Sequence, residues 1–367
     1  MSTLLKDYYS PGFYQQFTSF AAHTVPGFEP EAFMQGIFTP GFEAMELKER
    51  MRHTATVLHR FLSPDFPEAA SQICGIIRHM RQSGRVENSF PYLFFPDYIE
   101  QYGLAHLEAS VQAMEEITQF ISCEFAVRPF LVRYSAPMLS YMQAWAHHLH
   151  EGVRRLASEG IRPRLPWGMA IPYLKKDPAP IWPILEALKN DPSETVRRSV
   201  ANNLNDISKD HPEAVLEVAR RWIGLSPETD ALVKHACRTL LKQGNRTALG
   251  LFGLSGEALD APQAVLLTPQ VVQGTYLEFA FTAVNPGGVP RTLRLEYAVY
   301  FLLKNGTHYR KVFKISEREF QPGEKTEVTR RHSFRPITTR VYYPGLHRVA
   351  AIVNGSEGPA CEFELLA

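Results

Sequence analysis

The sequence predicts a protein of two unlike parts, an all-α array of repeated helix pairs followed by an all-β sandwich. Three observations support this division. Apolar residues recur every three to four positions up to about residue 250, which is typical of amphipathic helices. A segment of this region resembles another segment 43 residues further along the chain. After Gly250 the apolar residues alternate with period two, as in half-buried strands.

The composition is that of an ordinary globular protein. The chain has 367 residues, of which 45% are hydrophobic and 21% charged, so disordered and fibrous proteins are excluded. This length favours two domains or an elongated array over a single core. The chain has no run of 18 apolar residues and no apolar stretch near its start, so we expect neither a membrane span nor a signal peptide. Four cysteines without CxxC spacing favour the reducing cytoplasm.

Four long helices are expected in the first part of the chain. Turn dipeptides such as Ser63-Pro64 and Asp191-Pro192 separate helices along this region. The expected helices are Phe42–Leu62, Pro67–Arg81, Leu107–Val132 and Met138–Glu159.

An internal repeat indicates how the helices are arranged. The segment 150–157 resembles 193–200, and a weaker copy follows at 232–236. A period near 40 residues is typical of HEAT-like repeats, whose helix pairs stack into a curved solenoid with one concave face. We therefore expect a HEAT-like solenoid over residues 1–255.

The repeat also carries basic residues at matching positions. They are Arg154-Arg155, Arg197-Arg198 and Lys234-His235, and we expect them to form a basic stripe. Residues 128–246 hold 18 Lys/Arg against 12 Asp/Glu, although the whole chain has a net charge of only +1. Such a cluster favours a polyanionic partner. The alternative is a solvated helix surface on which one arginine of each pair packs locally.

Strand and turn signals fill the last part of the chain. Leu277 to Ala283 and Leu293 to Val299 alternate with period two, and Asn305-Gly306 is a hairpin signal. About seven strands in about 105 residues predict an immunoglobulin-like sandwich over residues 256–367. The Cys and Trp signature of antibody domains is missing, and the fold alone does not define a function.

Four segments resemble the AlkC/AlkD-type DNA alkylation repair glycosylases. The first, 123–130, reads Cys-Glu-Phe-Ala-Val-Arg-Pro-Phe and is similar to the AlkC branch. The others are 153–168, 200–212 and 233–240. The resemblance covers about residues 1–250, and part of the AlkC branch carries an immunoglobulin-like domain, which residues 331–345 resemble. The resemblance implies an enzyme that excises cationic alkylated bases, 3-methyladenine and 3-methylcytosine, from duplex DNA without full base flipping, and we expect it to act as a monomer.

A cationic base is a good leaving group, so a minimal site with one carboxylate and one positioned water suffices. Glu124 is the first candidate for this carboxylate, and its alternative is an ordinary helical ion pair with Arg128. Glu159 and Asp206 are further catalytic candidates, although Asp206 could instead brace a turn.

The remaining site candidates would contact DNA. Trp167 follows a proline-rich stretch in which no continuous helix can form, so we expect it to touch the lesion. Side chains able to hydrogen-bond phosphates are Arg155, Arg164, Arg198, Asn202, Asn203 and Lys209. In the sandwich, further contacts could come from Arg330, Arg331, Arg335 and Arg340, unless these form the polar face of an edge strand.

Other chemistries lack their motifs. His147, His148 and His150 occur without HExxH, and no phosphate-binding glycine loop or GxSxG motif is present, so we expect neither metal nor cofactor. The alternative to an enzyme is a non-enzymatic HEAT-repeat scaffold that binds DNA or protein. A third possibility is a glycosylase of the AlkD type, which prefers larger lesions such as 7-methylguanine.

Overall fold

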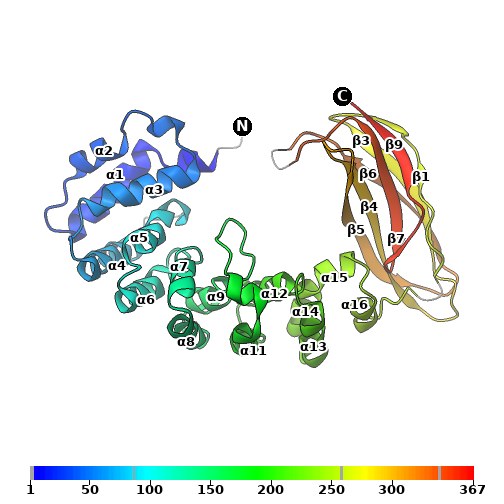
Figure 1. The fold of residues 1–367 in the computed structure, drawn as a ribbon, viewed down its shortest axis with the longest axis horizontal. Coiled ribbons are helices and arrows are strands. Elements are labelled where there is room, and N and C mark those ends of the chain that lie inside the picture. Colours follow the sequence, from blue (N-terminus) through cyan, green and yellow to red (C-terminus); the bar gives the residue numbers. More distant parts are fainter. Residues whose placement is uncertain (1–3, 85, 87, 257–258, 338–339) are drawn as a thin grey trace. The chain divides into compact units, whose positions relative to one another are not determined.

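The computed structural model describes residues 4–84, 86, 88–256, 259–337 and 340–367. Helices fill the chain up to Leu251, and strands follow from Val265 (Figure 1). The first eight α-helices are α1 (Pro11–Thr24), α2 (Pro30–Ile37), α3 (Leu47–His59), α4 (Phe66–Ser83), α5 (Phe94–Tyr102), α6 (Leu107–Ile117), α7 (Val127–Arg133) and α8 (Ser135–Trp145). The next eight are α9 (Glu151–Glu159), α10 (Pro172–Lys176), α11 (Trp182–Leu188), α12 (Glu194–Ile207), α13 (Pro212–Trp222), α14 (Pro227–Ala236), α15 (Arg238–Lys242) and α16 (Arg246–Leu251).

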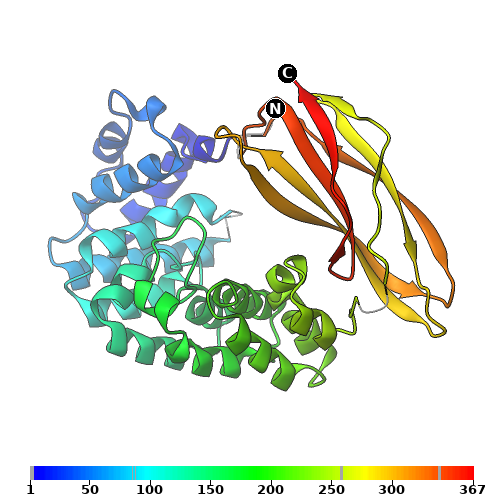
Figure 2. The same cartoon turned by 45° about the vertical axis from the view of Figure 1, so that its right-hand side comes forward.

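Helices two or three apart in the chain pack side by side, as expected for stacked pairs. In one row α3 packs on α5 and α9 packs on α12, and in the other row α4 packs on α6 and α8 on α11 (Figure 2). Apolar residues of these helices are buried, among them Leu58 of α3, Ile73 of α4 and Leu204 of α12. The predicted helical array is therefore present.

The 43-residue repeat has a structural counterpart. Arg154 donates Nη1 to the carbonyls of His148 and Leu149, six and five residues before it. Arg197 bonds in the same way to the carbonyls of Asp191 and Pro192. In each repeat this arginine holds the loop that leads into its helix, which explains why the same residue recurs there.

Two of the four expected helices are interrupted. The predicted helix Leu107–Val132 ends at Ile117, and a new helix begins only at Val127. Pro129 explains the second start, because a proline without an N–H group is tolerated in the first turn of a helix but not in its interior. The helix expected over Met138–Glu159 is also divided, by a turn at residues 146–150. The histidines of this turn therefore do not form a helix face.

The other two helices agree better with the sequence. α4 covers the predicted Pro67–Arg81, with Asp65 as N-cap and Gly84 in the left-handed region after its end. α3 begins at Leu47 rather than Phe42, because a short 3-10 turn, Phe42–Ala44, precedes it.

The strands form two sheets, as predicted for the sandwich. One has the order β1 (Val265–Leu266), β3 (Tyr276–Val284), β6 (Lys325–Ser333). The other has the order β2 (Gln270–Val272), β9 (Cys361–Leu366), β7 (Gly345–Val353), β4 (Arg291–Leu302), β5 (His308–Phe320), with β8 (Ser356–Glu357) paired to β7. Every pair is antiparallel except β2 with β9.

The predicted alternation is present in the core of the sandwich. Leu277, Phe279 and Phe281 on β3 are buried, as are Leu293 and Leu295 on β4. The Asn305-Gly306 signal forms the turn of the β4–β5 hairpin, with Gly306 at a φ of +80°.

Residues near the expected domain boundary link helices to strands. Contacts within the chain define two compact units. One consists of His211–Ile223 and Val233–Ala367, and the other consists of Met1–Asp210 and Gly224–Leu232. Within the former, Lys234 pairs with Glu317 of β5, and Asn354 donates to the carbonyl of Ser255. The boundary between residues 255 and 256 stays a prediction, and residues 257 and 258 lie outside the described part of the chain.

Candidate active site

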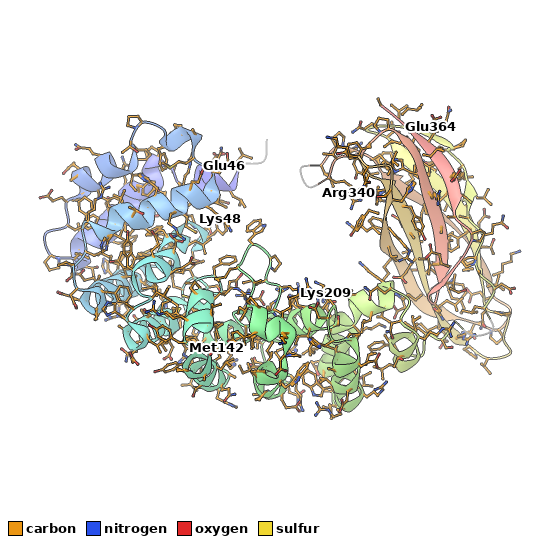
Figure 3. All side chains as sticks on the ribbon, in the orientation of Figure 1. Glu46, Lys48, Met142, Lys209, Arg340 and Glu364 are labelled. Carbon is orange, nitrogen blue, oxygen red and sulfur yellow. The ribbon has the colours of Figure 1, made fainter. Side chains whose placement is uncertain are left out.

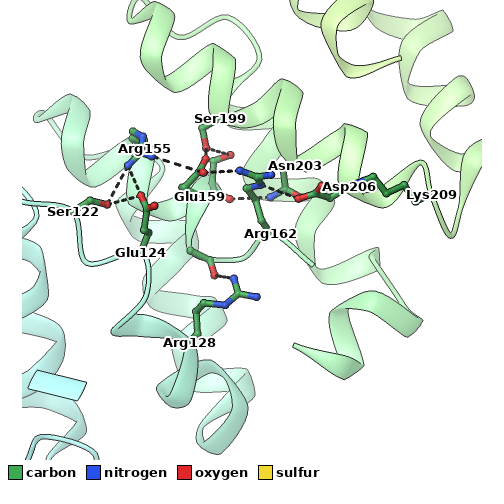
Figure 4. A network of polar contacts seen from close by, with 12 residues as sticks. Ser122, Glu124, Arg128, Arg155, Glu159, Arg162, Ser199, Asn203, Asp206 and Lys209 are labelled. Atoms are coloured by element: carbon green, nitrogen blue, oxygen red, sulfur yellow. Dashed lines mark hydrogen bonds and ion pairs between the residues drawn. The ribbon is translucent and has the colours of Figure 1, made fainter. Parts of the chain in front are cut away.

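The turn between α6 and α7 carries Glu124. The restart of the helix at Val127 leaves Glu124 outside regular structure. Its Oε2 lies 2.8 Å from Nη1 of Arg155 on α9 and accepts a 2.9 Å hydrogen bond from Ser122 (Figure 4). Arg155 also donates to the Ser122 hydroxyl. The expected alternative, a helical ion pair between Glu124 and Arg128, is not formed.

A buried chain of charges continues from Arg155. Nη2 of Arg155 lies 3.8 Å from Oε1 of Glu159, which accepts a 2.7 Å bond from Arg162. Arg162 donates Nε to Asp206 at 2.8 Å, and Lys209 lies 3.1 Å from the other Asp206 oxygen (Figure 4). Three carboxylates thus alternate with three cations, which is how buried charges remain tolerable.

Arg162 joins the two most buried carboxylates. The side chains of Glu159 and Asp206 are only 7% and 3% exposed. Burial lowers the pKa of Arg162, but Glu159 and Asp206 more than compensate, so the net pKa is raised. The guanidinium is therefore a fixed positive charge, and Ser199 adds a 2.6 Å hydrogen bond to Glu159.

Glu124 differs from the other two carboxylates in access. Its side chain is 18% exposed. Among the described residues, every hydrogen bond and ion pair of Glu124 uses Oε2, and none uses Oε1. One oxygen is thus held in place while the other is available to a ligand.

Arg128 lies fully buried below this network. It donates Nη1 to the carbonyl of Gly160 at 2.8 Å and Nε to that of Met169 at 2.5 Å. Its Nη2 has no partner among the described residues. Burial and the nearby Arg162 lower the pKa of Arg128 to about 10, so it stays charged at neutral pH. Its role is to fix the loop between residues 160 and 169.

Trp167 stands at the tip of that loop. Its φ is +64°, which is unusual for any residue other than glycine, and its side chain is 71% exposed. The loop closes by a bond from Gly168 N to the carbonyl of Leu165, and Lys48 of α3 donates Nζ to the carbonyl of Trp167. The sequence thus correctly indicated an irregular and accessible position for this indole.

The expected phosphate-binding residues differ in how far they are exposed. Arg164, Arg198 and Lys209 reach the surface, each beside a carboxylate; Arg164 binds Asp210 through two nitrogens, and Arg198 lies near Glu194. Asn202 on α12 is half-buried.

Asn203 does not fit a role in DNA binding. It is fully buried and donates to the carbonyl of Ser158, so it fastens α12 to α9. Since α9 carries Arg155 and Glu159, this buried amide supports the site indirectly. The expectation of a surface contact is therefore corrected.

The expected basic stripe is interrupted. Arg154 is tied to Asp191 as well as to the loop before it, and Arg197 is tied to its own loop. Lys234 pairs with Glu317. The packing alternative weighed from the sequence is correct for Arg154 and Arg197. The second arginine of each pair binds carboxylates instead, Arg155 those of Glu124 and Glu159 and Arg198 that of Glu194.

Sequence reasoning missed Arg162, Ser199 and Lys48. Arg162 lies inside a matched segment and directly before Pro163, but its partners are 3 and 44 residues away. In the part of the chain that the structure describes, no group of three or more His, Cys, Asp or Glu could hold a metal ion. Among the same residues, none of the helices has the length and hydrophobicity needed to cross a lipid bilayer.

Comparisons with known proteins agree with this architecture. The family model described as "Uncharacterised protein YhaZ, C-terminal Ig-like domain" matches residues 261–367. The uncharacterized protein YhaZ of Bacillus subtilis (strain 168) is 42% identical over 98% of this chain and 99% of its own. The alkylpurine DNA glycosylase AlkC of Pseudomonas fluorescens, solved bound to DNA containing an abasic site analog, is 34% identical with a TM-score of 0.91 over 100% of both chains.

The chain belongs to the AlkC family. The resemblance stated from four sequence segments is thus confirmed, including the AlkC branch with its immunoglobulin-like C-terminal domain. The predicted order of a HEAT-like helical part and an all-β sandwich is confirmed as well.

Proposed function

We propose that this AlkC-family chain is a DNA glycosylase that hydrolyses the N-glycosidic bond of cationic alkylated bases, 3-methyladenine and 3-methylcytosine, in duplex DNA. The main support for the proposal is the way in which Glu124 is held. Its side chain is a carboxylate with one oxygen fixed by Arg155 and Ser122 and the other unbonded, and Lys48 contacts both the next residue, Phe125, and the loop of the exposed Trp167. The similarity to an alkylpurine DNA glycosylase over the full length supports it.

Glu124 would act on the sugar rather than on the base. A cationic base leaves without an acid, so positive charge develops mainly on the deoxyribose. A carboxylate about 4 Å away stabilises that charge by roughly 1 kcal/mol in water and about 4 kcal/mol at an effective dielectric of 20. The available Oε1 of Glu124 would face this charge or hold the attacking water, and exclusion of solvent by bound DNA would strengthen the effect.

Glu159 and Asp206 act, in this proposal, through Arg155 and Arg162. Both carboxylates are more deeply buried than Glu124 and already bind guanidinium groups. They hold the cations that keep Glu124 in one orientation. The catalytic expectation for Glu159 and Asp206 thus becomes a positioning role.

Trp167 would contact the lesion from its loop. An indole beside a cationic base contributes on the order of 0.5–2 kcal/mol. Because this indole is exposed on a turn rather than placed in a closed pocket, we propose that the lesion is recognised without full base flipping. The proposed chemistry requires no metal and no cofactor.

Contacts to the DNA backbone would come from Arg155, Arg164, Arg198, Asn202 and Lys209. Arg164, Arg198 and Lys209 have carboxylate partners and would exchange an internal ion pair for a phosphate, whereas Arg155 would keep its ion pair with Glu124. In the sandwich, Arg335 lies over the ring of Tyr276 and Arg340 over that of Phe301, while Arg331 pairs with Glu278. We propose that these sandwich arginines, with Arg330, also bind DNA, and that the protein works as a monomer in the cytoplasm.

One experiment tests the proposal and its rival together. Duplex DNA treated with a methylating agent is incubated with the full chain, and released bases are identified by chromatography. The proposal expects 3-methyladenine and 3-methylcytosine in the released fraction. Salt-dependent DNA binding with no released base would favour the scaffold instead, and release of 7-methylguanine alone would favour an AlkD-like preference.

A further inference from the structure

The loop that carries Trp167 has a conformation that its own side chains do not explain. A bulky residue in the left-handed region costs about 1–2 kcal/mol. The indole is exposed, so burial of its ring does not offset this cost. Something outside the loop must hold the peptide.

Two cationic side chains contact the loop backbone. Arg128 binds the carbonyls of Gly160 and Met169, at the two ends of the loop. A Cβ at Gly168 would lie 3.3 Å from Nε of Arg128, so a glycine there lets the guanidinium approach closely. Lys48 holds the tip itself, since its Nζ lies 2.9 Å from the carbonyl oxygen of Trp167.

Lys48 comes from a distant part of the chain. It occupies the second position of α3, 119 residues before Trp167, and it projects from that helix in Figure 3. The start of α3 is fixed by a capping box between Glu46 and Glu49 and by the ion pair of Glu46 with Lys6. The ammonium group therefore extends from a well-defined helix end.

The same ammonium group faces the segment of Glu124. Nζ of Lys48 lies 5.9 Å from the ring centroid of Phe125, the residue after Glu124. This distance is at the outer limit of a cation–π contact. One side chain thus touches both segments that carry the candidate site, the turn of Glu124 and the loop of Trp167.

We propose that Lys48 is a positioning residue that fixes Trp167 relative to Glu124. This inference rests on the proposed glycosylase function for its catalytic consequence, but not for its structural content. A charge-assisted bond to the Trp167 carbonyl restrains a strained peptide, and misplacement of a binding group by about 1 Å can lower a rate up to about 100-fold. Lys48 itself touches neither base nor sugar in this proposal.

A spectroscopic test needs no enzymatic activity. The full chain is labelled with 5-fluorotryptophan, which gives signals for Trp145, Trp167, Trp182 and Trp222, and Trp167→Phe assigns its signal. Lys48→Met is expected to shift or broaden the Trp167 signal alone, and Lys48→Arg to restore it. Lys176→Met is the matched control, because Lys176 is an exposed lysine at the end of α10 and should leave the Trp167 signal unchanged. An unchanged Trp167 signal in Lys48→Met would overturn the proposal.

Kinetics separate positioning from direct phosphate binding. For Lys48→Met we expect kcat on lesion DNA to fall about tenfold, with affinity for undamaged DNA and its salt dependence unchanged. A different result would overturn the proposal: kcat stays unchanged, and the plot of log binding constant against log salt concentration becomes less steep by about 0.9. Lys48 would then be a phosphate contact. If the wild-type chain releases no base, the proposed function fails while the fluorine spectra still decide the position of Trp167.

Discussion

Arg155 joins Glu124 to Glu159. Its Nη1 lies 2.8 Å from Oε2 of Glu124, and its Nη2 lies 3.8 Å from Oε1 of Glu159. The accessible carboxylate of the candidate site is therefore connected through one guanidinium to a buried network. The geometry of Glu124 therefore depends, through Arg155, on the buried Glu159 and Arg162.

Removal of Arg162 should destabilise the helical part. Arg162→Met leaves Glu159 and Asp206 buried and unpaired, and breaking a buried ion pair in this way costs about 3–5 kcal/mol. Urea unfolding followed by circular dichroism measures the loss. Adding Glu159→Gln and Asp206→Asn to the same chain removes the unpaired charges and should recover much of it. Equal stability of wild type and Arg162→Met would contradict the network.

Replacement of Trp167 by glycine should separate stability from function. Glycine adopts a φ of +64° without strain, so Trp167→Gly should raise the free energy of unfolding by about 1 kcal/mol. The same change removes the exposed indole and should lower base release. Trp167→Phe is the control, because it keeps the strain and an aromatic ring. A destabilised glycine variant would show that the loop conformation is not strained.

Protonation of His332 at acidic pH should destabilise the sandwich. Burial, with smaller contributions from Arg340 and Lys311, lowers the pKa of His332 from 6.5 to about 4. Because the unfolded chain binds this proton at higher pH than the folded chain, stability falls as pH drops from 6.5 to about 4. The loss is about 3 kcal/mol at pH 4.

Thermal unfolding at several pH values measures this dependence. His332→Gln should flatten it between pH 6.5 and 4, since an amide can still hydrogen-bond to Tyr297 without taking up a proton. His308→Gln is the control, since His308 is a histidine of the same sandwich that is only half-buried. A slope unchanged by His332→Gln would assign the acid sensitivity to other groups, among them His347, whose pKa burial also lowers.

Release of Arg164 from Asp210 should strengthen DNA binding. Asp210→Asn removes a negative charge and the carboxylate that holds Arg164 through two nitrogens. Affinity for undamaged duplex should rise, and the logarithmic salt dependence should become steeper by up to about 0.9 if Arg164 gains a phosphate. Fluorescence anisotropy at several salt concentrations measures both. Weaker binding by Asp210→Asn would show that the ion pair orients Arg164 instead.

The sequence predicted those features that depend on local periodicity. The alternation from Leu277 to Phe281 and the turn at Asn305-Gly306 are local signals, and both appear where expected. Pro129 was a local signal as well, but the continuous apolar pattern from Leu107 to Val132 concealed it. As a result the sequence placed Glu124 on a helix, and the structure places it in a turn.

The partners of the candidate residues were not predictable in the same way. Arg162 and Asp206 are 44 residues apart, and Lys48 and Trp167 are 119 apart, so only stacking of the helices brings them together. Asn203 was taken for a surface residue because amides usually are. Its burial follows from a bond to Ser158 on the neighbouring helix, which no local pattern reveals.

The most direct test of the account is single-turnover excision by Glu124→Gln. The variant keeps size and hydrogen bonding but loses the negative charge, so we expect excision of 3-methyladenine to slow by about 100- to 1,000-fold with DNA affinity nearly unchanged. Glu116→Gln, which neutralises a surface glutamate paired with Arg78, is the control and should retain the wild-type rate. Equal rates for Glu124→Gln and the wild type would contradict the central claim that this carboxylate assists departure of the base.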